Sequence, residues 1–500
     1  MKKILKTISL LGASAMTMVL ASCGGGGDSD KIVIDFWHTF GDKVENSIQN
    51  QVDEFERRVK THEGVDVEIK LTYKGGYDDM PQHITTSLAG GDSPTLAIAY
   101  PDHVADYIKA EGNNPGKYVV NLQDFIDNSE TTFGTDLYLD DDQGEEDFIE
   151  AFIDEGRHYT RDGMYSLPIM KSTEVMIYNR DIVEAALPYY NAEYYHPEHG
   201  SDLLPGQLAD FINDTMTWDD LMDYAKVIFD NKETIAPSLV VPVMYDSDSN
   251  LFITKLYQNE IGYSSIDPTT KQGVIDFETG TARAQAEALV QKWKDEYYRS
   301  ETNTKPYLLA TKGTYGEYGS NLFKAEETAF TIGSTGGSGY TFPEEGSFVA
   351  VVARVPTDNP NKSVYISQGP TLTMLTHPRF SSQKAATLQL YAWKFLKFLT
   401  SSEVNVDITC NGSEGYLPVR HSSYTTELFY DFVDNGGEYV QVADIVQNKI
   451  LGAYINTPVF PGSKTLRDQV GGIVTNALLG TDSITSIFNS AINTTKLDIA

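Results

Sequence analysis

The spacing of apolar residues changes repeatedly between residues 31 and 108, and this alternation constrains the fold more than any other feature of the chain. Ile32 to Trp37 form a compact apolar run, which predicts a buried strand. The amphipathic helix predicted next has an apolar face that repeats every three or four residues: Val44, Ile48, Val52, Phe55 and Val59. Gly64 is a typical helix stop, and residues 65–72 alternate between apolar and polar, which predicts a second strand. The first unit is therefore β-α-β.

The same alternation continues through the rest of the chain. Apolar spacing over residues 80–88 predicts a helix that Gly90-Gly91 ends, residues 96–99 predict a short buried strand, and Pro101-Asp102 start the next helix. Further elements are expected as strands in 165–179, a helix capped by Thr217, a helix over 383–399 and helices in the last 35 residues. Strands that alternate with helices predict an α/β fold with helices on both faces of the sheet.

The 500-residue chain is long enough for two or more domains, and its 41% of hydrophobic residues is sufficient to build their cores. It carries 71 Asp and Glu against 38 Lys and Arg, which gives a formal net charge of −33. A surface this negative repels phosphate backbones and anionic lipid headgroups. The composition therefore argues against nucleic-acid partners and against electrostatic attachment to a membrane surface.

The first residues have the pattern of a secretory signal. Three lysines are followed by a mostly apolar stretch, residues 8–20, that is too short to span a bilayer. Leu20-Ala21-Ser22-Cys23 resembles the bacterial lipobox, which implies that a signal peptide of residues 1–22 is removed and that Cys23 is the lipidation site. Cleavage removes three lysines and no acid, so the net charge becomes −36. Residues 23–30 then form a glycine-rich tether, and an uncleaved short anchor is the alternative.

Cys23 and Cys410 are the only two cysteines of the chain. If Cys23 is lipid-modified, no intramolecular disulfide is available. The fold must then be stabilised by packing alone.

Two acidic segments partly resemble calcium loops. An EF-hand loop needs glycine at its sixth position and glutamate at its twelfth. The segment from Asp140 has Glu145 and Ala151 there, and the segment from Asp246 has Leu and Tyr. The His-Pro-Glu-His run at 196–199 differs from the zinc motif His-Glu-x-x-His, and its proline disrupts the helix that such a motif needs. We therefore expect solvated acidic loops and no metal site.

No set of catalytic residues stands out. The chain has no Gly-x-Ser-x-Gly elbow, and its glycine-rich segment 333–339 lacks the Lys-Ser/Thr pair that a phosphate-binding loop requires. We therefore expect no catalytic residue, no cofactor and no enzyme activity. The paired carboxylates of a glycoside hydrolase stay open as an alternative, because their spacing is set in three dimensions.

Aromatic and small polar residues gather where strands are expected to end: Trp37-His38-Thr39, Tyr77-Asp78 and Ser172-Thr173. Aromatic faces suit the apolar faces of sugar rings, while carboxylates and hydroxyls hydrogen-bond the ring hydroxyls. The mixture predicts a neutral, polyhydroxylated ligand. Any one of these aromatics, taken alone, is more often a core residue.

A series of short motifs runs along nearly the whole chain: Phe36-Trp37-His38, Tyr73 to Asp78, Gly91 to Thr95, Tyr165 to Pro168, Tyr178 to Asp181, Thr217 to Asp220, residues 323–333, residues 392–402 and Gly415 to Arg420. In this order they resemble the family 1 extracellular solute-binding proteins of carbohydrate ABC importers, in the branch that binds glycerol 3-phosphate, maltose and oligosaccharides. Each motif is weak alone, but the shared order makes coincidence a poor explanation.

The resemblance implies a two-lobed, periplasmic-binding-protein-like (type II) α/β fold, whose lobes close by a hinge over a ligand in the cleft between them. Lobe 1 is expected to hold residues 31–170 and 335–375, and lobe 2 residues 171–334 and 376–500. The chain is expected to cross between the lobes near Lys171-Ser172, Ser334-Thr335 and Leu375-Thr376.

The resemblance also implies where a ligand binds. Carried over by position, the substrate-binding residues are Trp37, His38, Tyr77, Asp78, Ser172, Ser334, Thr335, Gln368, Gly369 and Tyr416. The segment Asp246 to Asn250 is a weaker candidate from lobe 2. Phosphate-ester binders of this branch place an arginine before the final helices, whereas here residues 459–461 are Val-Phe-Pro, with Lys464 and Arg467 only nearby. A neutral mono- or oligosaccharide is therefore expected.

For function, the resemblance implies a monomeric, lipid-anchored protein on the extracytoplasmic face of the cell membrane. Its partners would be a carbohydrate ligand and the transmembrane subunits of an ABC permease. Two alternatives stay open: a surface lipoprotein that binds or cleaves glycosides, and a ligand-sensing partner of a membrane kinase with the same fold.

Overall fold

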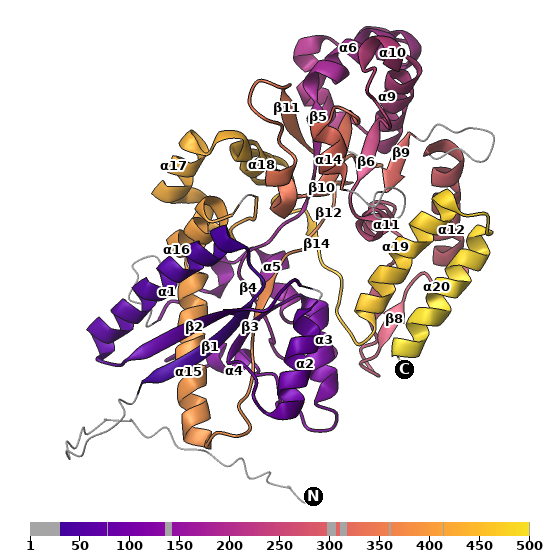
Figure 1. Cartoon of the computed structure of the whole chain (residues 1–500). Helices are drawn as coiled ribbons and strands as arrows, with labels where there is room; N and C mark the ends of the chain where they lie inside the picture. Colours follow the sequence, from indigo (N-terminus) through magenta and orange to yellow (C-terminus); the bar gives the residue numbers. More distant parts are fainter. Residues whose placement is uncertain are drawn as a thin grey trace, which may run out of the picture.

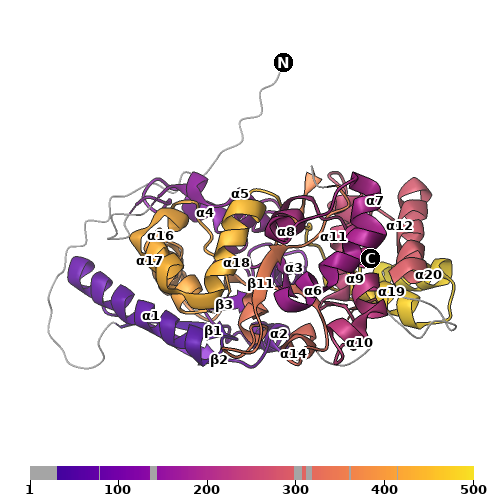
Figure 2. The same cartoon turned by 90° about the horizontal axis from the view of Figure 1, so that it is seen from above.

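The computed structural model describes residues 31–77, 79–135, 143–297, 307–310, 318–359, 362–413 and 415–499. These residues form two α/β lobes, each with its own five-stranded sheet and its own main hydrophobic core (Figure 1). Seen from above, α1 (Asp42–Glu63) and α17 (Glu427–Asn435) lie toward one end of the molecule, and α12 (Gly280–Lys292) and α20 (Ile484–Ile499) lie at the other end (Figure 2). The fold is therefore the two-lobed, periplasmic-binding-protein-like α/β fold that the sequence predicts.

The lobe 1 sheet has the strand order β2-β1-β3-β13-β4. Its strands are β1 (Ile32–His38), β2 (Val67–Tyr73), β3 (Leu96–Ala99), β4 (Leu167–Pro168) and β13 (Thr371–Met374). The strands β1, β2 and β3 are parallel, while β13 runs antiparallel to both β3 and β4. A strand from late in the chain therefore completes the sheet that the N-terminal β-α-β unit begins.

Helices cover both faces of the lobe 1 sheet. They are α1 (Asp42–Glu63), α2 (Met80–Gly90), α3 (Pro101–Ala110), α4 (Gln123–Ile126), α5 (Glu150–Glu155), α15 (Ser382–Leu399), α16 (Ser402–Val406) and α17 (Glu427–Asn435). The next helix, α18 (Val440–Ile445), lies between the lobes, with Ala443 in the lobe 1 core and Val442 and Ile445 in the lobe 2 core. On one face α1 and α15 pack together, with the rings of Phe55 and Phe395 5.1 Å apart. On the other face Ile84 of α2 and Val104 of α3 join a smaller core cluster with Ala97 of β3.

The elements predicted at the start of the chain are confirmed. The apolar face of α1 is buried at Ile48, Val52, Phe55 and Val59. The helix ends at Gly64, whose φ of 73° is left-handed and therefore suits glycine. Burial of this repeating face against the sheet is what positions α1.

The lobe 2 sheet has the strand order β11-β5-β10-β6-β9. Its strands are β5 (Glu174–Asn179), β6 (Val243–Tyr245), β9 (Leu308–Ala310), β10 (Phe330–Ser334) and β11 (Ala350–Arg354). The strand β5 runs antiparallel to both β10 and β11, and β10, β6 and β9 are parallel. The carboxyl end of β10 therefore lies beside the start of β5, where the chain enters lobe 2.

Lobe 2 is the larger helical body. Its helices are α6 (Arg180–Tyr190), α7 (His196–His199), α8 (Leu208–Asp210), α9 (Trp218–Asp230), α10 (Lys232–Ile235), α11 (Asp248–Gln258), α12 (Gly280–Lys292), α14 (Gly319–Lys324), α19 (Ser463–Leu479) and α20 (Ile484–Ile499). Thr217 caps α9, as predicted, by accepting a hydrogen bond from the Asp220 amide. The hairpin of β7 (Ser264–Ile266) and β8 (Gly273–Ile275) lies at the lower end of α19 (Figure 1).

In the described part of the chain, three segments run between the lobes. Residues 169–173 join β4 to β5, residues 355–370 join β11 to β13, and residues 446–462 lead from α18 to α19. Between the lobes, β12 (Tyr365–Ile366) and β14 (Tyr454–Ile455) of the last two segments pair in parallel. The first crossing lies where the sequence places it, at Lys171-Ser172.

The expected lobe boundaries need correction in two segments. Within 335–375, which was assigned to lobe 1, β11 belongs to the lobe 2 sheet because Ala350 pairs with Asn179 of β5. Within 376–500, which was assigned to lobe 2, α15 belongs to lobe 1 because Trp393 and its neighbours pack in the lobe 1 core.

Two of the expected crossing points are corrected for the same reason. Ser334-Thr335 ends β10 inside lobe 2, and Leu375-Thr376 follows β13 inside lobe 1. Both crossings that were misplaced depend on pairing between strands far apart in the sequence.

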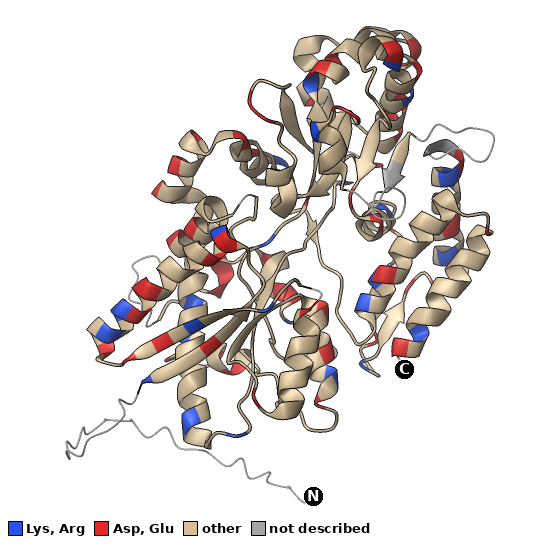
Figure 3. Cartoon of the chain, viewed as in Figure 1, with Lys and Arg blue, Asp and Glu red and all other residues tan. Residues whose placement is uncertain are grey.

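Charged residues lie mainly on the outer helices, with Lys and Arg interspersed among Asp and Glu over both lobes (Figure 3). Cys410 is buried. Cys23 and Asp78 lie outside the described residues. Within the described ranges, no helix combines the length and the apolar character needed to cross a membrane.

Candidate functional site

Two adjoining cavities lie on the inner face of lobe 2 and between the lobes. The larger has a volume of about 810 Å³ and is lined by lobe 2 and by the 355–370 crossing segment. The smaller, of about 320 Å³, is lined by residues of both lobes. Ser334, Gln368 and Arg467 line both cavities. We therefore treat them as one cleft with a large chamber and a small chamber.

Two crossing segments are joined at the wall of this cleft. The Ser172 amide donates to the Gln368 carbonyl at 2.7 Å, and the Gln368 amide donates back to the Ser172 carbonyl at 3.0 Å. The Ser334 hydroxyl donates to the Ser172 hydroxyl at 3.1 Å. The structure thus brings together three residues that the sequence nominates, and all three line the small chamber.

Gly369 and Tyr416, also nominated from the sequence, line the small chamber as well. Gly369 has a φ of +115°, and a Cβ at this position would lie 2.9 Å from the carbonyl oxygen of Met170. Glycine is therefore needed for the close approach of the two crossing segments. Beside Tyr416, Leu417 exchanges two backbone hydrogen bonds with Lys171, at 2.7 and 3.1 Å, which fixes the loop to the first crossing.

A buried ion pair lies directly behind the first crossing. The Lys171 side chain is 0% exposed and pairs with Glu155 of α5, which itself lines the small chamber. The Lys171 ammonium also approaches the Gly369 carbonyl at 3.5 Å. One lysine thus links α5 of lobe 1 to both crossing segments at the cleft.

Asn250 is the centre of a polar network in the large chamber. Its side-chain amide donates to Glu174 at 2.8 Å and to the Gln368 side chain at 3.0 Å. Its carbonyl oxygen accepts a hydrogen bond from Arg467 of α19. The network joins β5, α11, α19 and the 355–370 segment, because each contributes one of these residues. Ser247 caps α11 by accepting from the Asn250 backbone amide at 3.2 Å, which orients the start of the helix.

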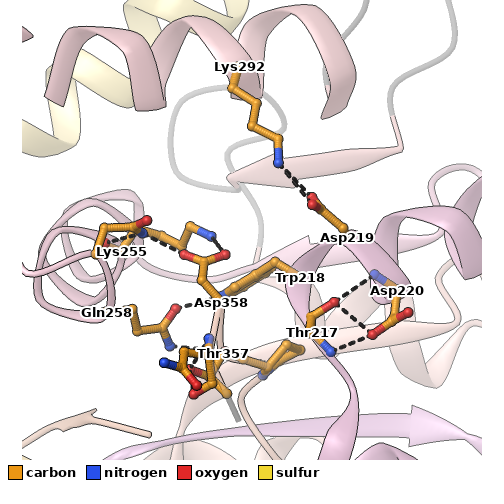
Figure 4. A network of polar contacts seen from close by, with 12 residues as sticks. Thr217, Trp218, Asp219, Asp220, Lys255, Gln258, Lys292, Thr357 and Asp358 are labelled. Carbon is orange, nitrogen blue, oxygen red and sulfur yellow. Dashed lines mark hydrogen bonds and ion pairs between the residues drawn. The ribbon is translucent and has the colours of Figure 1, made fainter. Parts of the chain in front are cut away.

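The other end of α11 is fixed by a second, buried network (Figure 4). Lys255 pairs with Asp358 at 2.5 Å. Gln258 donates to a carbonyl of the 355–370 segment at 3.0 Å and accepts a hydrogen bond from the Trp218 indole at 2.9 Å. Burial lowers the pKa of Lys255 to about 8. Both ends of α11 are therefore tied to the segment that supplies Gln368 to the cleft.

Glu174 is a nearly buried carboxyl group in the wall of the large chamber, with 3% of its surface exposed. It accepts hydrogen bonds from Asn250 and from the Tyr245 phenol. Burial, the largest contribution, raises the pKa of Glu174 from 4.5 to about 7. Burial also raises the pKa of Asp246, which lines the same chamber, from 3.8 to about 6.

The raised pKa of Glu174 has a consequence for stability. Between about pH 4.5 and 7 the folded chain binds more protons at this site than the unfolded chain, so this site's contribution to stability falls as the pH rises. We expect Glu174→Gln to remove this pH dependence. As the pH rises from 4.5 to 8, the free energy of unfolding of the variant should therefore increase by about 3 kcal/mol relative to that of the natural chain. Urea unfolding of both proteins across this range measures the difference. Parallel pH profiles for the two proteins would contradict it.

Tyrosines border both chambers. Tyr318 and Tyr340 line the large chamber and are 59% and 71% exposed, which is high for such large side chains. Tyr100 and Tyr263 line the small chamber. Tyr77 does not line either chamber but stacks behind Tyr100, with ring centroids 4.6 Å apart.

The remaining nominated residues lie away from the two chambers. Trp37 packs partly buried against the small core cluster of lobe 1, with the Lys74 ammonium 3.9 Å from its ring centre. His38 is 1% exposed between aromatic neighbours, and burial lowers its pKa. Thr335 is buried and pairs with Thr173 by a backbone hydrogen bond of 2.8 Å. These three residues support the fold next to the cleft.

Acidic side chains predominate in the cleft. The carboxyl groups that line it are Asp102, Glu155, Glu174, Asp246, Asp248 and Asp468. Among the lining residues that the structure describes, Arg467 is the one basic side chain. The sequence had placed Arg467 only near the site, so its position in the wall of both chambers is a correction.

The weaker nomination, Asp246 to Asn250, lines the large chamber along its whole length. In the described ranges, no group of three or more His, Cys, Asp or Glu side chains is placed to hold a metal ion.

Sequence reasoning missed Glu174, Tyr318, Tyr340 and Arg467. None of them belongs to a local motif: Glu174 starts β5, Tyr318 directly precedes α14, Tyr340 ends the short helical segment after β10, and Arg467 lies one turn inside α19. A weak signal existed for Glu174 alone, because it directly follows the nominated Ser172-Thr173.

Two α/β lobes, three crossing segments and a chambered cleft at the crossing define a class of protein, the two-lobed solute-binding proteins. The chain belongs to the bacterial extracellular solute-binding protein family, whose model matches residues 50–433. This membership places the protein outside the cytoplasm and confirms the resemblance seen in the sequence. No curated protein matches the chain.

Solved structures share the fold at low sequence identity. The GacH receptor of Streptomyces glaucescens, solved unliganded and with acarbose, is 16% identical with a TM-score of 0.61, over 94% of this chain and 98% of that one. An ABC substrate-binding protein of Listeria monocytogenes in complex with cycloalternan is 16% identical with a TM-score of 0.62, over 94% and 99%. UgpB of Mycobacterium tuberculosis in complex with glycerophosphocholine is 16% identical with a TM-score of 0.63, over 95% and 99%.

Proposed function

We propose that this protein captures a neutral carbohydrate in the inter-lobe cleft and delivers it to the transmembrane subunits of an ABC importer. The observation that carries the proposal is the combination of two exposed tyrosines, Tyr318 and Tyr340, with the hydroxyl, amide and carboxyl groups of the large chamber. Aromatic faces pack on sugar rings, and polar groups of these kinds hydrogen-bond ring hydroxyls. Among the residues that the structure describes, one guanidinium and six carboxyl groups line the cleft, which favours an uncharged ligand over an anion.

Similar proteins support this assignment. Those named above were solved with acarbose, with cycloalternan and with glycerophosphocholine. Two of these three ligands are saccharides or saccharide analogues, which agrees with the chemistry of the cleft.

The mechanism is a change of population between open and closed forms. A ligand that contacts both lobes in the small chamber stabilises the closed form, because those contacts exist only when the lobes are together. The closed, ligand-loaded monomer then docks on the permease. No bond is made or broken, and no cofactor or metal takes part.

The N-terminus would hold the protein near its permease. In this proposal residues 1–22 are removed as a signal peptide, Cys23 carries acyl chains such as palmitate, and residues 23–30 are a flexible tether on the outer face of the cell membrane. An acylated N-terminus anchors a soluble domain without a membrane-spanning helix.

A thermal unfolding screen of the mature chain tests the proposal. Neutral mono- and oligosaccharides, phosphorylated sugars and short peptides are compared, each at concentrations up to 10 mM. A ligand present at 100 times its Kd stabilises the folded protein by about 2.7 kcal/mol, so a saccharide that binds raises the Tm. A screen in which only phosphorylated ligands or peptides raise the Tm would exclude carbohydrate capture.

We expect the exposed tyrosines to contribute to affinity through ring stacking. Tyr340→Ala and Tyr318→Ala should each weaken saccharide binding about 10-fold, because one aromatic stacking contact contributes about 1 kcal/mol beyond its buried area. Tyr430→Ala is the matched control, since Tyr430 is 54% exposed on α17 and lines neither chamber. Calorimetric titration measures all three. Equal affinities for the Tyr340 and Tyr430 variants would remove Tyr340 from the site.

A further inference from the structure

Among the described residues that line the cleft, Arg467 is the one charged side chain that borders both chambers. It lines the large and the small chamber, together with the uncharged Ser334 and Gln368. Among the described residues it makes one side-chain hydrogen bond, to Asn250, and no ion pair. A guanidinium has five N–H donors in a planar fork. Most of the donors of Arg467 are therefore available to a molecule in the cleft.

The single bond that Arg467 makes has a fixed direction. Asn250 is 3% exposed, and both hydrogens of its amide group are used, one by Glu174 and one by Gln368. Its carbonyl oxygen must therefore point away from them, toward Arg467. Because Gln368 is itself held by Ser172 on the other crossing segment, the guanidinium is positioned relative to the crossing.

The chemistry around Arg467 selects among possible ligand groups. The six carboxyl groups among the described lining residues oppose a phosphate or carboxylate ligand, although a guanidinium alone would attract one. Neutral oxygens, such as adjacent hydroxyls of a sugar, accept hydrogen bonds from the fork without adding negative charge to the cleft.

The position of Arg467 also points to ligand length. A ligand confined to one chamber contacts Arg467 only with one end of the ligand. A ligand that extends from one chamber into the other passes alongside Arg467. Chambers of about 810 and 320 Å³ together exceed the space that one sugar ring fills.

Building on the proposed function, we propose that Arg467, held by Asn250, is the specificity-determining residue for neutral saccharides of two or more rings. It donates hydrogen bonds to ring or linkage oxygens where the ligand crosses between the chambers. A single ring, bound in the large chamber, depends on it little.

Calorimetric titration of the mature chain with neutral saccharides of one, two, three and four rings tests this inference. For Arg467→Met we expect about a 10- to 100-fold loss of affinity for ligands of two or more rings, because hydrogen bonds from a charged donor are lost. The loss for a single ring should stay below about 3-fold. Arg180→Met is the matched control, since Arg180 is exposed on α6 outside both chambers, and it should change no affinity.

A double-mutant cycle tests the role of Asn250. Asn250→Ala should reproduce most of the loss of affinity for longer ligands. Adding Asn250→Ala to Arg467→Met should weaken binding by less than about 3-fold more, because both substitutions disrupt the same Asn250–Arg467 pair. Unfolding in the absence of ligand confirms that each variant is folded.

The outcomes separate two failures. If the natural chain binds no saccharide, the proposed function fails. If it binds saccharides but Arg467→Met weakens one-ring and longer ligands equally, or weakens neither, only this inference fails. Tighter binding of phosphorylated than of neutral sugars, lost in Arg467→Met, would overturn the inference by making Arg467 an anion site.

Discussion

Lys171→Met is expected to lower the free energy of unfolding by about 3–5 kcal/mol. Lys171 is fully buried, and its partner Glu155 is nearly so. Removing the ammonium leaves the Glu155 carboxylate buried without its counter-charge, which costs far more than the surface area that methionine retains. Urea unfolding at pH 7 measures the change. The loss of stability should be large because the Lys171–Glu155 pair also holds together the two crossing segments that line the small chamber.

Two comparisons isolate the cause of this loss. Lys271→Met breaks an exposed ion pair with Asp162, formed at 3.1 Å between the lobes, and should change stability by less than about 1 kcal/mol. Combining Lys171→Met with Glu155→Leu should recover more than half of the loss, because no charge is then left buried. If Lys171→Met lowers the free energy of unfolding by no more than Lys271→Met does, the Lys171–Glu155 pair is not buried in the folded protein.

Gly415→Ala is expected to cost about 4 kcal/mol and to weaken ligand binding at least 10-fold. Gly415 has a φ of +128°, and a Cβ there would lie 1.8 Å from the carbonyl oxygen of Thr335. One of the two backbones must therefore move. Because Tyr416 follows directly and lines the small chamber, the displacement reaches the cleft.

Gly437→Ala separates the two contributions to this effect. Gly437 also has a left-handed φ, of +66°, but a Cβ there would meet nothing within 4 Å. Its substitution should cost only about 1 kcal/mol, the backbone strain alone, and should leave ligand affinity unchanged. Equal losses in the two variants would show that Gly415 is required for its backbone conformation and not for its close contact.

The local elements of the fold could be predicted from the sequence because each has a local cause. The apolar face of α1, the left-handed Gly64 that ends it and the Thr217 cap of α9 are all set within a few residues. The two misplaced crossings have no local cause. Pairing of Ala350 with Asn179 joins strands 171 residues apart, and no spacing within either strand encodes it.

The residues of the site also divide into those that could be predicted from the sequence and those that depend on tertiary packing. Ser172, Gln368 and Gly369 were predicted because the family resemblance could be carried over to them by position, and the structure places them at the cleft wall. Arg467 and Tyr340 were missed because α19 and the segment after β10 reach the cleft only through the packing of lobe 2. Trp37 and His38 belong to a motif, yet they lie in and beside the lobe 1 core, so that motif marks the fold and not the lining of either chamber.

Calorimetric titration of the mature chain with neutral saccharides, followed by chemical analysis of the ligand after its release, is the most direct test of carbohydrate capture. We expect one saccharide to bind per chain and to be recovered intact, because the cleft binds and releases its ligand without breaking a bond. Failure of every neutral saccharide to bind, or recovery of a cleaved saccharide, would contradict the proposed function.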